Sequence, residues 1–492
     1  MKVIKVFGLV ILSLAIGGCL SMGDFEGPRP GETWHVSTEL LPIRERPDAM
    51  SPTVKALVYK DAVTIEKAVR VSPDFNGDRN RLPEDLIPCW VRVFAGGASG
   101  YVPIPSLASD WLIDNQNPDE TISDEGMVAA KRGFSESETD AELASMRGAA
   151  GAGKVASVSD MVAVERALTS RTNVSDADVA TFVAEGSLKG NPVTPVDLDV
   201  GTRSSTSGFA LGASRFASQG LNAAAVAAGQ NQSTEGQMAS AAGKAAAGAV
   251  HNEVGPVQEF QMGKVVASRI FPLYKIVAPS DTRALYLARV GTALAMASND
   301  PMPYHGYLFI LVESNEVNAF AVPGGFVFVT TGMLEFLKDE DELAAIIGHE
   351  IGHMELRHGI KAVGKERVLK LFSMLKEIGV DGTGGVMTAQ LKELVDEVLG
   401  KLLRSIRNGY GIEIESQADW RSLQLCARLG YDTKALYDVL ERFKEAKGSY
   451  GGASYPAERG ADILKYRQQL GYAEAAAVRA ERAARYKANV KR

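Results

Sequence analysis

Histidine and cysteine are scarce in this sequence, whose 492 residues include six His and three Cys. The cysteines show no spacing typical of a metal site, which argues against a cysteine-based zinc module. The net charge of −7 argues against a nucleic-acid partner. After residue 16, no stretch is long and apolar enough to cross a bilayer. The hydrophobic content of 46% still provides material for two or three domains with substantial cores.

Two of the few histidines form the motif His349-Glu350-Ile351-Gly352-His353, the sequence form of a zinc hydrolase site. On an α-helix, residues i and i+4 lie on one face, so His349 and His353 can bind a single ion. Glu350 can then take a proton from a water at the open coordination position, and this water can attack a peptide carbonyl. The motif therefore predicts a hydrolase that cleaves peptide bonds.

The residues around this motif predict that it lies on a helix. Acids at 339–342 suit a first helical turn, where the helix dipole favours negative charge. Apolar residues then recur at helical spacing: Leu343, Ile346, Ile347, Ile351 and Met354. This apolar face favours a zinc site over a chance match.

A third ligand must come from elsewhere in the chain. His358 lies five residues after His353, whereas the metzincin pattern needs six and an intervening glycine, so we interpret His358 as a polar residue near the helix end. Glu415 and Asp419 share one face of a second predicted helix. Glu415 can bind zinc while Asp419 accepts the N–H of a ligating histidine. Acids on an exposed helix face are the alternative interpretation of this pair.

Three blocks of the sequence together resemble the HtpX-like, BepA-like and CAAX-prenyl-protease-like zinc metallopeptidases, a branch of the gluzincins. The blocks are residues 318–332, 349–353 and 415–419. The resemblance covers about residues 255–445, including a predicted helix at Asp281–Met296 and a predicted strand at Tyr307–Glu313.

The resemblance implies one Zn²⁺ per chain. His349, His353 and Glu415 would be its ligands, Glu350 would be the general base, and Asp419 would be the hydrogen-bond partner of His349. Both Glu350 and Asp419 are therefore expected to act in catalysis.

The sequence departs from this family at one position. Members often carry a His-Pro pair followed by an arginine, with this His near the metal, whereas here Tyr455 precedes Pro456 and Arg459 follows. A tyrosine could still donate a hydrogen bond to an oxyanion. The substitution argues against gating through a fourth imidazole.

The block before the motif predicts a strand that binds substrate. Asn318, Ala319, Phe320 and Ala321 precede a Pro-Gly-Gly break and a second run of β-formers at Phe326–Thr330. A sheet edge beside the zinc would bind an extended peptide through main-chain hydrogen bonds. An ordinary buried hairpin is the alternative.

The N-terminus predicts a lipoprotein. Two lysines precede an apolar run at Val6–Ile16, and Ile16-Gly17-Gly18-Cys19 resembles a bacterial lipobox. Residues 1–18 would be a signal peptide and 19–32 a tether, with lipid on Cys19. An ordinary signal peptide with an incidental Cys is the alternative. Leu20, rather than Asp, follows Cys19, which favours the outer membrane and a periplasm-facing protein.

The rest of the chain predicts three further segments. Residues 33–110 resemble a bacterial SH3-like domain, with strands at Trp34–Leu40, Thr53–Tyr59, Ala62–Val69 and Trp90–Phe94. Trp90 and Tyr101 would pack in its core or line a groove for a peptide or cell wall. Residues 111–254 are an Ala/Gly/Ser-rich spacer with short helices, one of them at Ser175–Gly186. A basic helical tail at 461–492 follows the peptidase domain of 255–460, and the sequence predicts no role for it.

The predicted fold class is α+β: a mostly helical zincin-type metalloprotease domain with a small β-sheet, preceded by a small all-β SH3-like barrel. The predicted function is a lipid-anchored periplasmic zinc endopeptidase that hydrolyses unfolded or misassembled envelope proteins; this substrate class is implied by the resemblance. The alternative is a lipoprotein scaffold or chaperone with a catalytically quiet metallo-domain, against which the intact Glu350 argues. Pairing of Cys89 with Cys426 stays open.

Overall fold

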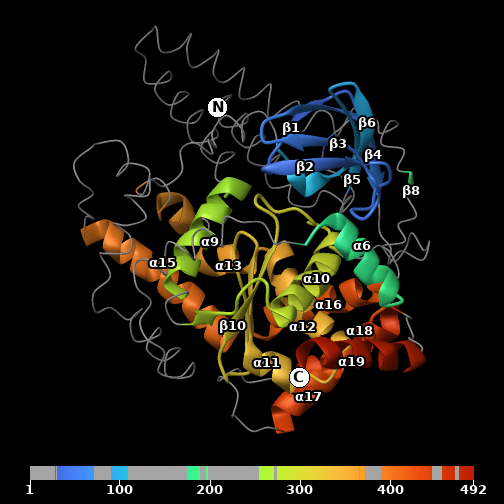
Figure 1. Cartoon of the computed structure of the whole chain (residues 1–492). Coiled ribbons are helices and arrows are strands. Elements are labelled where there is room, and N and C mark those ends of the chain that lie inside the picture. Colours follow the sequence, from blue (N-terminus) through green and yellow to red (C-terminus); the bar gives the residue numbers. More distant parts are fainter. Residues whose placement is uncertain are drawn as a thin grey trace, which may run out of the picture.

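The computed structural model describes residues 28, 30–70, 90–108, 174–188, 196–197, 254–270, 274–364, 366–371, 374, 389–445, 457–470 and 476–491. The predictions for the signal peptide, Cys19, Cys89, Tyr455 and most of the spacer lie outside these residues. Figure 1 shows a β-sheet formed by the N-terminal strands, drawn in blue, above a larger and mostly helical part.

The N-terminal part is an antiparallel sheet in the order β3-β2-β6-β5-β4-β1-β7. Its strands are β1 (Thr33–Val36), β2 (Leu40–Arg44), β3 (Thr53–Val58), β4 (Ala62–Arg70), β5 (Trp90–Ala95), β6 (Ala98–Pro103) and β7 (Leu107–Ala108), and the short β8 (Val196–Asp197) pairs with β4. Alternate side chains such as Leu41 and Ile43, or Val91 and Val93, fill its core. The prediction of an all-β N-terminal part is confirmed.

Two details of this sheet differ from the predicted strands. The chain leaves the sheet at residues 37–39, so Trp34–Leu40 is not one strand but the end of β1 and the start of β2. Trp90 is buried in the same apolar cluster as the helical part of the molecule. Core packing, rather than a groove, is therefore the role of Trp90.

The sheet is joined to the helical part by polar and aromatic contacts. The backbone N–H of Glu39 donates to the carbonyl of Tyr304, and the carboxylate of Glu39 lies 2.8 Å from Nδ1 of His305.

The predicted helix Ser175–Gly186 is confirmed as α6 (Asp176–Glu185), whose capping box pairs Ser175 with Asp178. Figure 1 places α6 beside α10.

A second, four-stranded sheet lies within the helical part, in the order β11-β12-β10-β9. Its strands are β9 (Lys275–Ile276), β10 (Leu308–Glu313), β11 (Ala319–Val322) and β12 (Phe326–Thr330). Strand β10 runs parallel to β12, whereas β11 and β12 form an antiparallel hairpin. Its turn needs glycine, because Gly325 has φ of 104° and a Cβ there would lie 2.2 Å from the carbonyl oxygen of Gly306. Within the described sheet, β11 is an edge strand.

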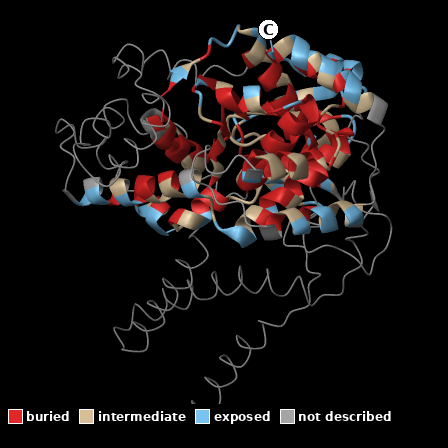
Figure 2. Cartoon of the chain, turned by 90° about the horizontal axis from the view of Figure 1, so that it is seen from below, coloured by how far each residue is buried: buried red, intermediate tan, exposed pale blue. Residues whose placement is uncertain are grey.

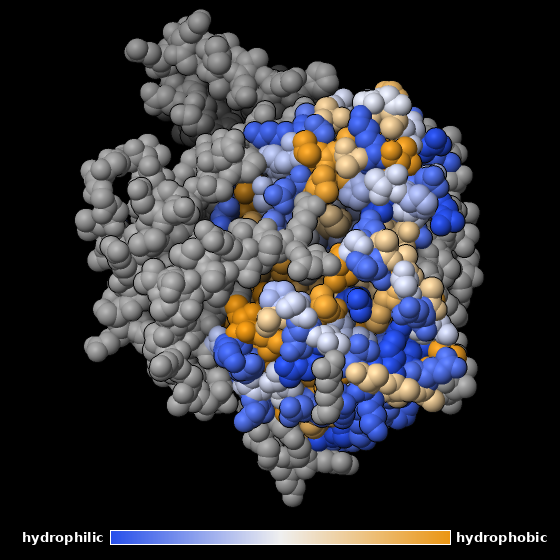
Figure 3. Space-filling model, viewed as in Figure 1, coloured by the Kyte–Doolittle hydropathy of each residue, from blue (hydrophilic) through white to orange (hydrophobic). Residues whose placement is uncertain are grey.

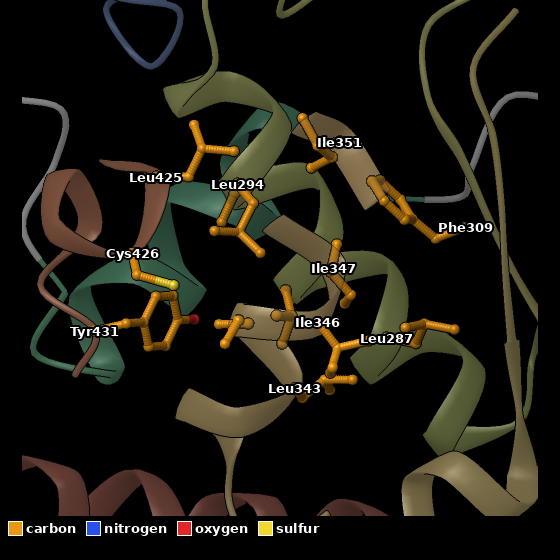
Figure 4. Close-up of a cluster of buried hydrophobic side chains, with 14 of the residues drawn as sticks. Leu287, Leu294, Phe309, Leu343, Ile346, Ile347, Ile351, Leu425, Cys426 and Tyr431 are labelled. Carbon is orange, nitrogen blue, oxygen red and sulfur yellow. The ribbon is translucent and has the colours of Figure 1, made fainter. Parts of the chain in front are cut away.

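Helix α12 (Glu340–Glu355) occupies the middle of this part. The other helices are α9 (Pro256–Ile270), α10 (Thr282–Ala297), α11 (Thr331–Phe336), α13 (His358–Val363), α15 (Ala389–Asn408), α16 (Ile412–Leu429), α17 (Ala435–Glu445), α18 (Ala457–Leu470) and α19 (Ala476–Val490). Figure 2 shows the central helices as almost wholly buried, and Figure 4 shows Leu287 and Leu294 of α10 close to Ile346 and Ile347 of α12.

The close approach of α12 and α16 depends on small residues. A Cβ on Gly352 would lie 3.1 Å from the carbonyl oxygen of Ala418, and a Cβ on Gly348 would lie 3.1 Å from Oγ of Ser422. The Ser422 hydroxyl also donates to the carbonyl of Ala345 at 2.6 Å. The glycine inside the histidine motif therefore allows α16 to bring its acids up to α12.

The α+β fold class is confirmed, with an all-β part followed by a mostly helical part. The helix predicted at Asp281–Met296 is α10, for which Asp281 is the N-cap. Among the described helices, none has the length and apolar character needed to cross a membrane. Figure 3 shows a mostly hydrophilic surface in the region where α17, α18 and α19 lie in Figure 1.

Candidate metal centre

Helix α12 brings His349 and His353 onto one face, as the four-residue spacing predicts. Their Nε2 atoms lie 3.0 Å apart, and both side chains are less than a tenth exposed. The helix begins at the N-cap Asp339, which accepts the backbone N–H of Glu342. The two imidazoles thus converge on one point.

Glu415 of α16 completes this cluster. Its Oε2 lies 3.3 Å from Nε2 of His349, and its Oε1 lies 3.7 Å from Nε2 of His353. One nitrogen or oxygen atom from each of the three residues falls within 4.8 Å of the others. No other group of three such residues is found in the part of the chain that the structure describes. The three sequence-predicted ligands are therefore brought together.

Asp419 lies one helical turn after Glu415 and contacts the other side of the His349 ring. Its Oδ1 is 2.9 Å from Nδ1 of His349, so Nε2 of that ring is left to face the cluster. The guanidinium of Arg459, from α18, donates to both oxygens of Asp419 at 2.7 and 2.9 Å. Arg459 also lies 3.4 Å from Glu415. It thus orients two carboxylates at once.

His358 is absent from the ligand cluster but contacts it. The chain reverses at Arg357, which has a positive φ of 53°, and His358 then starts the short helix α13. Nδ1 of His358 lies 2.8 Å from Nδ1 of His353, and its Nε2 lies 3.3 Å from Oε1 of Gln417. The sequence spacing predicts that His358 is not a ligand, but it gives no signal for the contact of His358 with His353.

Glu350 lies between α12 and the edge strand β11. It is 8% exposed and accepts a hydrogen bond from the backbone N–H of Ala321. Burial raises the pKa of Glu350 to about 7, against the lowering effect of His349. A carboxylate with a pKa near neutrality can both take up and release a proton at physiological pH.

The residues predicted to bind substrate lie on or next to β11. Phe320 turns its side chain into the core, where its ring stacks on Phe328 at 5.0 Å. Asn318 precedes the strand, and its backbone N–H donates to Oγ1 of Thr330. Ala319 and Ala321 carry small side chains, and the backbone N–H of Ala321 is the one that donates to Glu350.

The electrostatics of the cluster suit a cation. Burial alone would lower the pKa of His349, but hydrogen bonds to Asp419 and Glu415 outweigh this effect and raise it to about 10. Burial opposes the ionisation of Glu415, yet His349 holds the pKa of Glu415 well below its usual range. Burial lowers the pKa of His353, which keeps that ring neutral and able to ligate. The two-histidine, one-carboxylate donor set therefore fits Zn²⁺.

Comparison with known proteins connects this geometry to a peptidase family. The sequence model of Peptidase family M48 matches residues 281–477. The chain is 32% identical over 136 residues to mitochondrial metalloendopeptidase OMA1 of Schizosaccharomyces pombe, covering 28% of this chain and 37% of that protein. It is 25% identical over 173 residues to the beta-barrel assembly-enhancing protease of Yersinia pestis and 27% identical over 161 residues to that of Escherichia coli K12; each match covers 32% of both chains. The chain thus spans about a third of the length of these relatives.

Proposed function

We propose that this chain, whose residues 281–477 form a domain of peptidase family M48, is a zinc-dependent endopeptidase that cleaves unfolded or misassembled envelope proteins. The observation that carries the proposal is the convergence of His349, His353 and Glu415, with Glu350 next to them in α12. Zinc bound to these three residues would polarise the carbonyl of the peptide bond and make a water more acidic.

The chain's own residues would then perform the remaining chemistry. Glu350 would take the proton from the attacking water and pass it to the leaving nitrogen, a role supported by its raised pKa. Asp419 would hold His349 in the tautomer that leaves Nε2 for the metal, because it contacts Nδ1 of that ring. Arg459 would keep the carboxylate of Asp419 in place.

The edge strand β11 would bind the substrate as an added strand. Within the predicted segment of Asn318, Ala319, Phe320 and Ala321, the main chain of Ala319 and the carbonyl of Ala321 would hold an extended peptide with little preference for its side chains. The N–H of Asn318 already donates to Thr330, and that of Ala321 to Glu350. The short distance between β11 and Glu350, joined through the Ala321 N–H, would place a bound peptide beside the proposed base. Such sequence-independent binding suits a protease that acts on unfolded chains.

The cellular setting is proposed from the N-terminal sequence and the relatives. The lipobox-like Ile16-Gly17-Gly18-Cys19 would attach lipid to Cys19 and hold the enzyme at the periplasmic face of the outer membrane. Relatives named beta-barrel assembly-enhancing protease support envelope proteins as substrates. The N-terminal sheet, proposed as SH3-like, would contact a peptide or cell wall.

Mass spectrometry of the mature N-terminus tests the proposed lipid anchor. Cys19→Ser should release the enzyme from the membrane or leave it unprocessed.

Replacement of the base tests the activity. Glu350→Gln should keep one zinc per chain and lower the rate of cleavage of a urea-unfolded outer-membrane protein by about 10²- to 10⁴-fold. Glu393→Gln, an exposed position on α15, is the matched control and should behave as wild type. Wild-type protein that binds zinc and captures proteins from cells as well as Glu350→Gln does, but cleaves no unfolded substrate, would favour the scaffold alternative.

A further inference from the structure

Tyr410 lies next to the metal cluster in the short linker between α15 and α16. It is flanked by Gly409, with φ of 76°, and Gly411, with φ of 96°. Side chains rarely adopt such φ values, so the linker depends on both glycines. A Cβ on Gly409 would lie 3.1 Å from Oε1 of Glu415. The backbone of this linker is therefore packed against the carboxylate of a proposed ligand.

Two contacts connect Tyr410 directly to the proposed ligands. Its backbone N–H donates to Oε1 of Glu415 at 2.9 Å. Its ring lies 4.8 Å from the ring of His353, with an interplanar angle of 36°. The ring of His358, which also packs against His353, is 6.1 Å away. Tyr410 thus fixes one ligand through its main chain and packs against another through its side chain.

The hydroxyl of Tyr410 remains to be explained. No hydrogen bond to it is found among the residues that the structure describes. A phenol is ordinarily protonated at neutral pH, so this hydroxyl can donate a hydrogen bond.

We propose that Tyr410 is a further residue of the active site: its main chain and ring position Glu415 and His353, and its hydroxyl donates to the carbonyl oxygen of the peptide bond being cleaved. This inference rests on the proposed peptidase function and deepens it. The hydroxyl would act on the oxygen that gains negative charge during the attack, where a fixed donor stabilises the transition state more than the ground state.

Two substitutions separate the parts of this proposal. Tyr410→Phe keeps the backbone N–H and the ring and removes only the hydroxyl. Tyr410→Ala keeps the backbone N–H but also removes the ring from His353. Tyr101→Phe, on β6 of the N-terminal sheet, is the matched control. For each zinc-loaded protein we would measure zinc affinity by chelator competition, cleavage of an unfolded peptide, and calorimetric binding of a phosphinic peptide that imitates the tetrahedral transition state.

Tyr410→Phe should keep wild-type zinc affinity and KM, lower kcat roughly 100-fold, and weaken binding of the phosphinic peptide by a similar factor. Tyr410→Ala should also weaken zinc binding. Equal kcat and equal phosphinic peptide affinity in Tyr410→Phe and wild type would overturn the role of the hydroxyl while leaving the peptidase function intact. Wild-type protein that neither cleaves the peptide nor binds the phosphinic peptide would instead overturn the proposed function, and this inference with it.

Discussion

The two ends of helix α12 both bury charged groups, but these groups are neutralised in different ways. At the N-terminal end, the four consecutive acids from Asp339 to Glu342 are each 7% exposed or less. Toward the C-terminal end, His349, Glu350 and His353 are 7–9% exposed. One helix of sixteen residues therefore carries two clusters that would be costly to bury alone.

At the acid end, arginines of the same chain supply the opposite charge. The guanidinium of Arg482 lies 2.6 and 2.9 Å from the two oxygens of Asp341, and both side chains are fully buried. Three further pairs surround it: Arg479 with Asp339, Arg485 with Glu340, and Arg442 with Glu342. All but Arg442 come from α19, so the basic tail helix neutralises the first turn of α12.

At the metal end, the chain supplies donors, and the proposed Zn²⁺ would supply the main positive charge. Arg459 is the cation within 4 Å of Glu415 and Asp419 among the described lysines and arginines, and its partners also hold His349. The acid end is thus completed when the chain folds, whereas the metal end would be completed when it binds the proposed zinc. Substitutions at the acid end should lower the free energy of unfolding. Substitutions at the metal end should weaken zinc binding and activity.

The largest expected effect is loss of the metal. Glu415→Ala should abolish zinc binding and proteolysis, because two imidazoles alone form an incomplete site. The urea midpoint of the metal-free variant should differ from that of metal-free wild type by less than the midpoint of Arg482→Ala differs from wild type. Elemental analysis and equilibrium unfolding measure the two quantities, with the exposed neighbour Glu413→Ala as control. Full zinc occupancy in Glu415→Ala would refute its assignment as a ligand.

The next effect is on stability at the acid end. Arg482→Ala leaves the Asp341 carboxylate buried and unpaired, which should cost about 3–5 kcal/mol of unfolding free energy. The zinc affinity of the folded fraction should not change. The double variant Asp341→Leu, Arg482→Met removes both charges and should recover most of the stability. Urea denaturation checks both, and a double variant as unstable as the single one would contradict this explanation.

The free energy of unfolding should depend on pH through Asp300, because one oxygen of its carboxyl has no hydrogen-bond partner in the described part of the chain. Burial, and then the charges of Glu355 and Glu259, raise the pKa of Asp300 to about 7. The folded protein therefore binds a proton more tightly than the unfolded chain, so this group makes stability fall as pH rises from about 4 to about 7. Asp300→Asn should gain about 2–3 kcal/mol over wild type between pH 5 and pH 8.

Urea unfolding of both proteins at the two pH values measures this gain. Glu45→Gln, at an exposed position directly after β2, is a suitable control for the general effect of removing a carboxylate. A constant difference between Asp300→Asn and wild type at pH 5 and pH 8 would show that Asp300 does not titrate in this range.

The parts of the site that sequence could predict are those set by local spacing. The four-residue repeats of His349 with His353, and of Glu415 with Asp419, fix which side chains share a helix face. The apolar periodicity of α12 likewise predicts a buried helix. These features need no knowledge of which elements pack together.

The contacts that were missed join residues far apart in the chain. Arg482 pairs with Asp341 across 141 positions, and Arg459 pairs with Asp419 across 40. From the sequence alone, the acids of α12 predict only a favourable interaction with the helix dipole. Nothing in their local sequence shows that they are buried against α19. Arg357 has a positive φ, which brings His358 back to His353. Its side chain contacts Glu259 in α9 and the carbonyl of Val254 just before α9, both about 100 positions earlier in the chain.

The smallest effect expected is at Asp419, which belongs to the metal end but contacts no metal. Asp419→Asn replaces the charged acceptor beside Nδ1 of His349 by a neutral amide, so the ring is less well oriented. Zinc binding and turnover should each weaken by about 10- to 100-fold. Because Asp419 also binds Arg459 through two hydrogen bonds, a second explanation must be separated: the pair could simply attach α18 to α16.

Metal titration, peptide cleavage and urea unfolding of the same preparation distinguish these roles. If Asp419 acts through His349, zinc affinity and kcat fall and Arg459→Lys, which keeps a cation near Asp419, lowers them less. If the pair only attaches α18, unfolding free energy falls in both variants while zinc affinity and kcat of the folded protein stay at wild-type values. That second result would show that Asp419 takes no part in metal binding. The difference between the acid end and the metal end of α12 would then rest on the three proposed ligands alone.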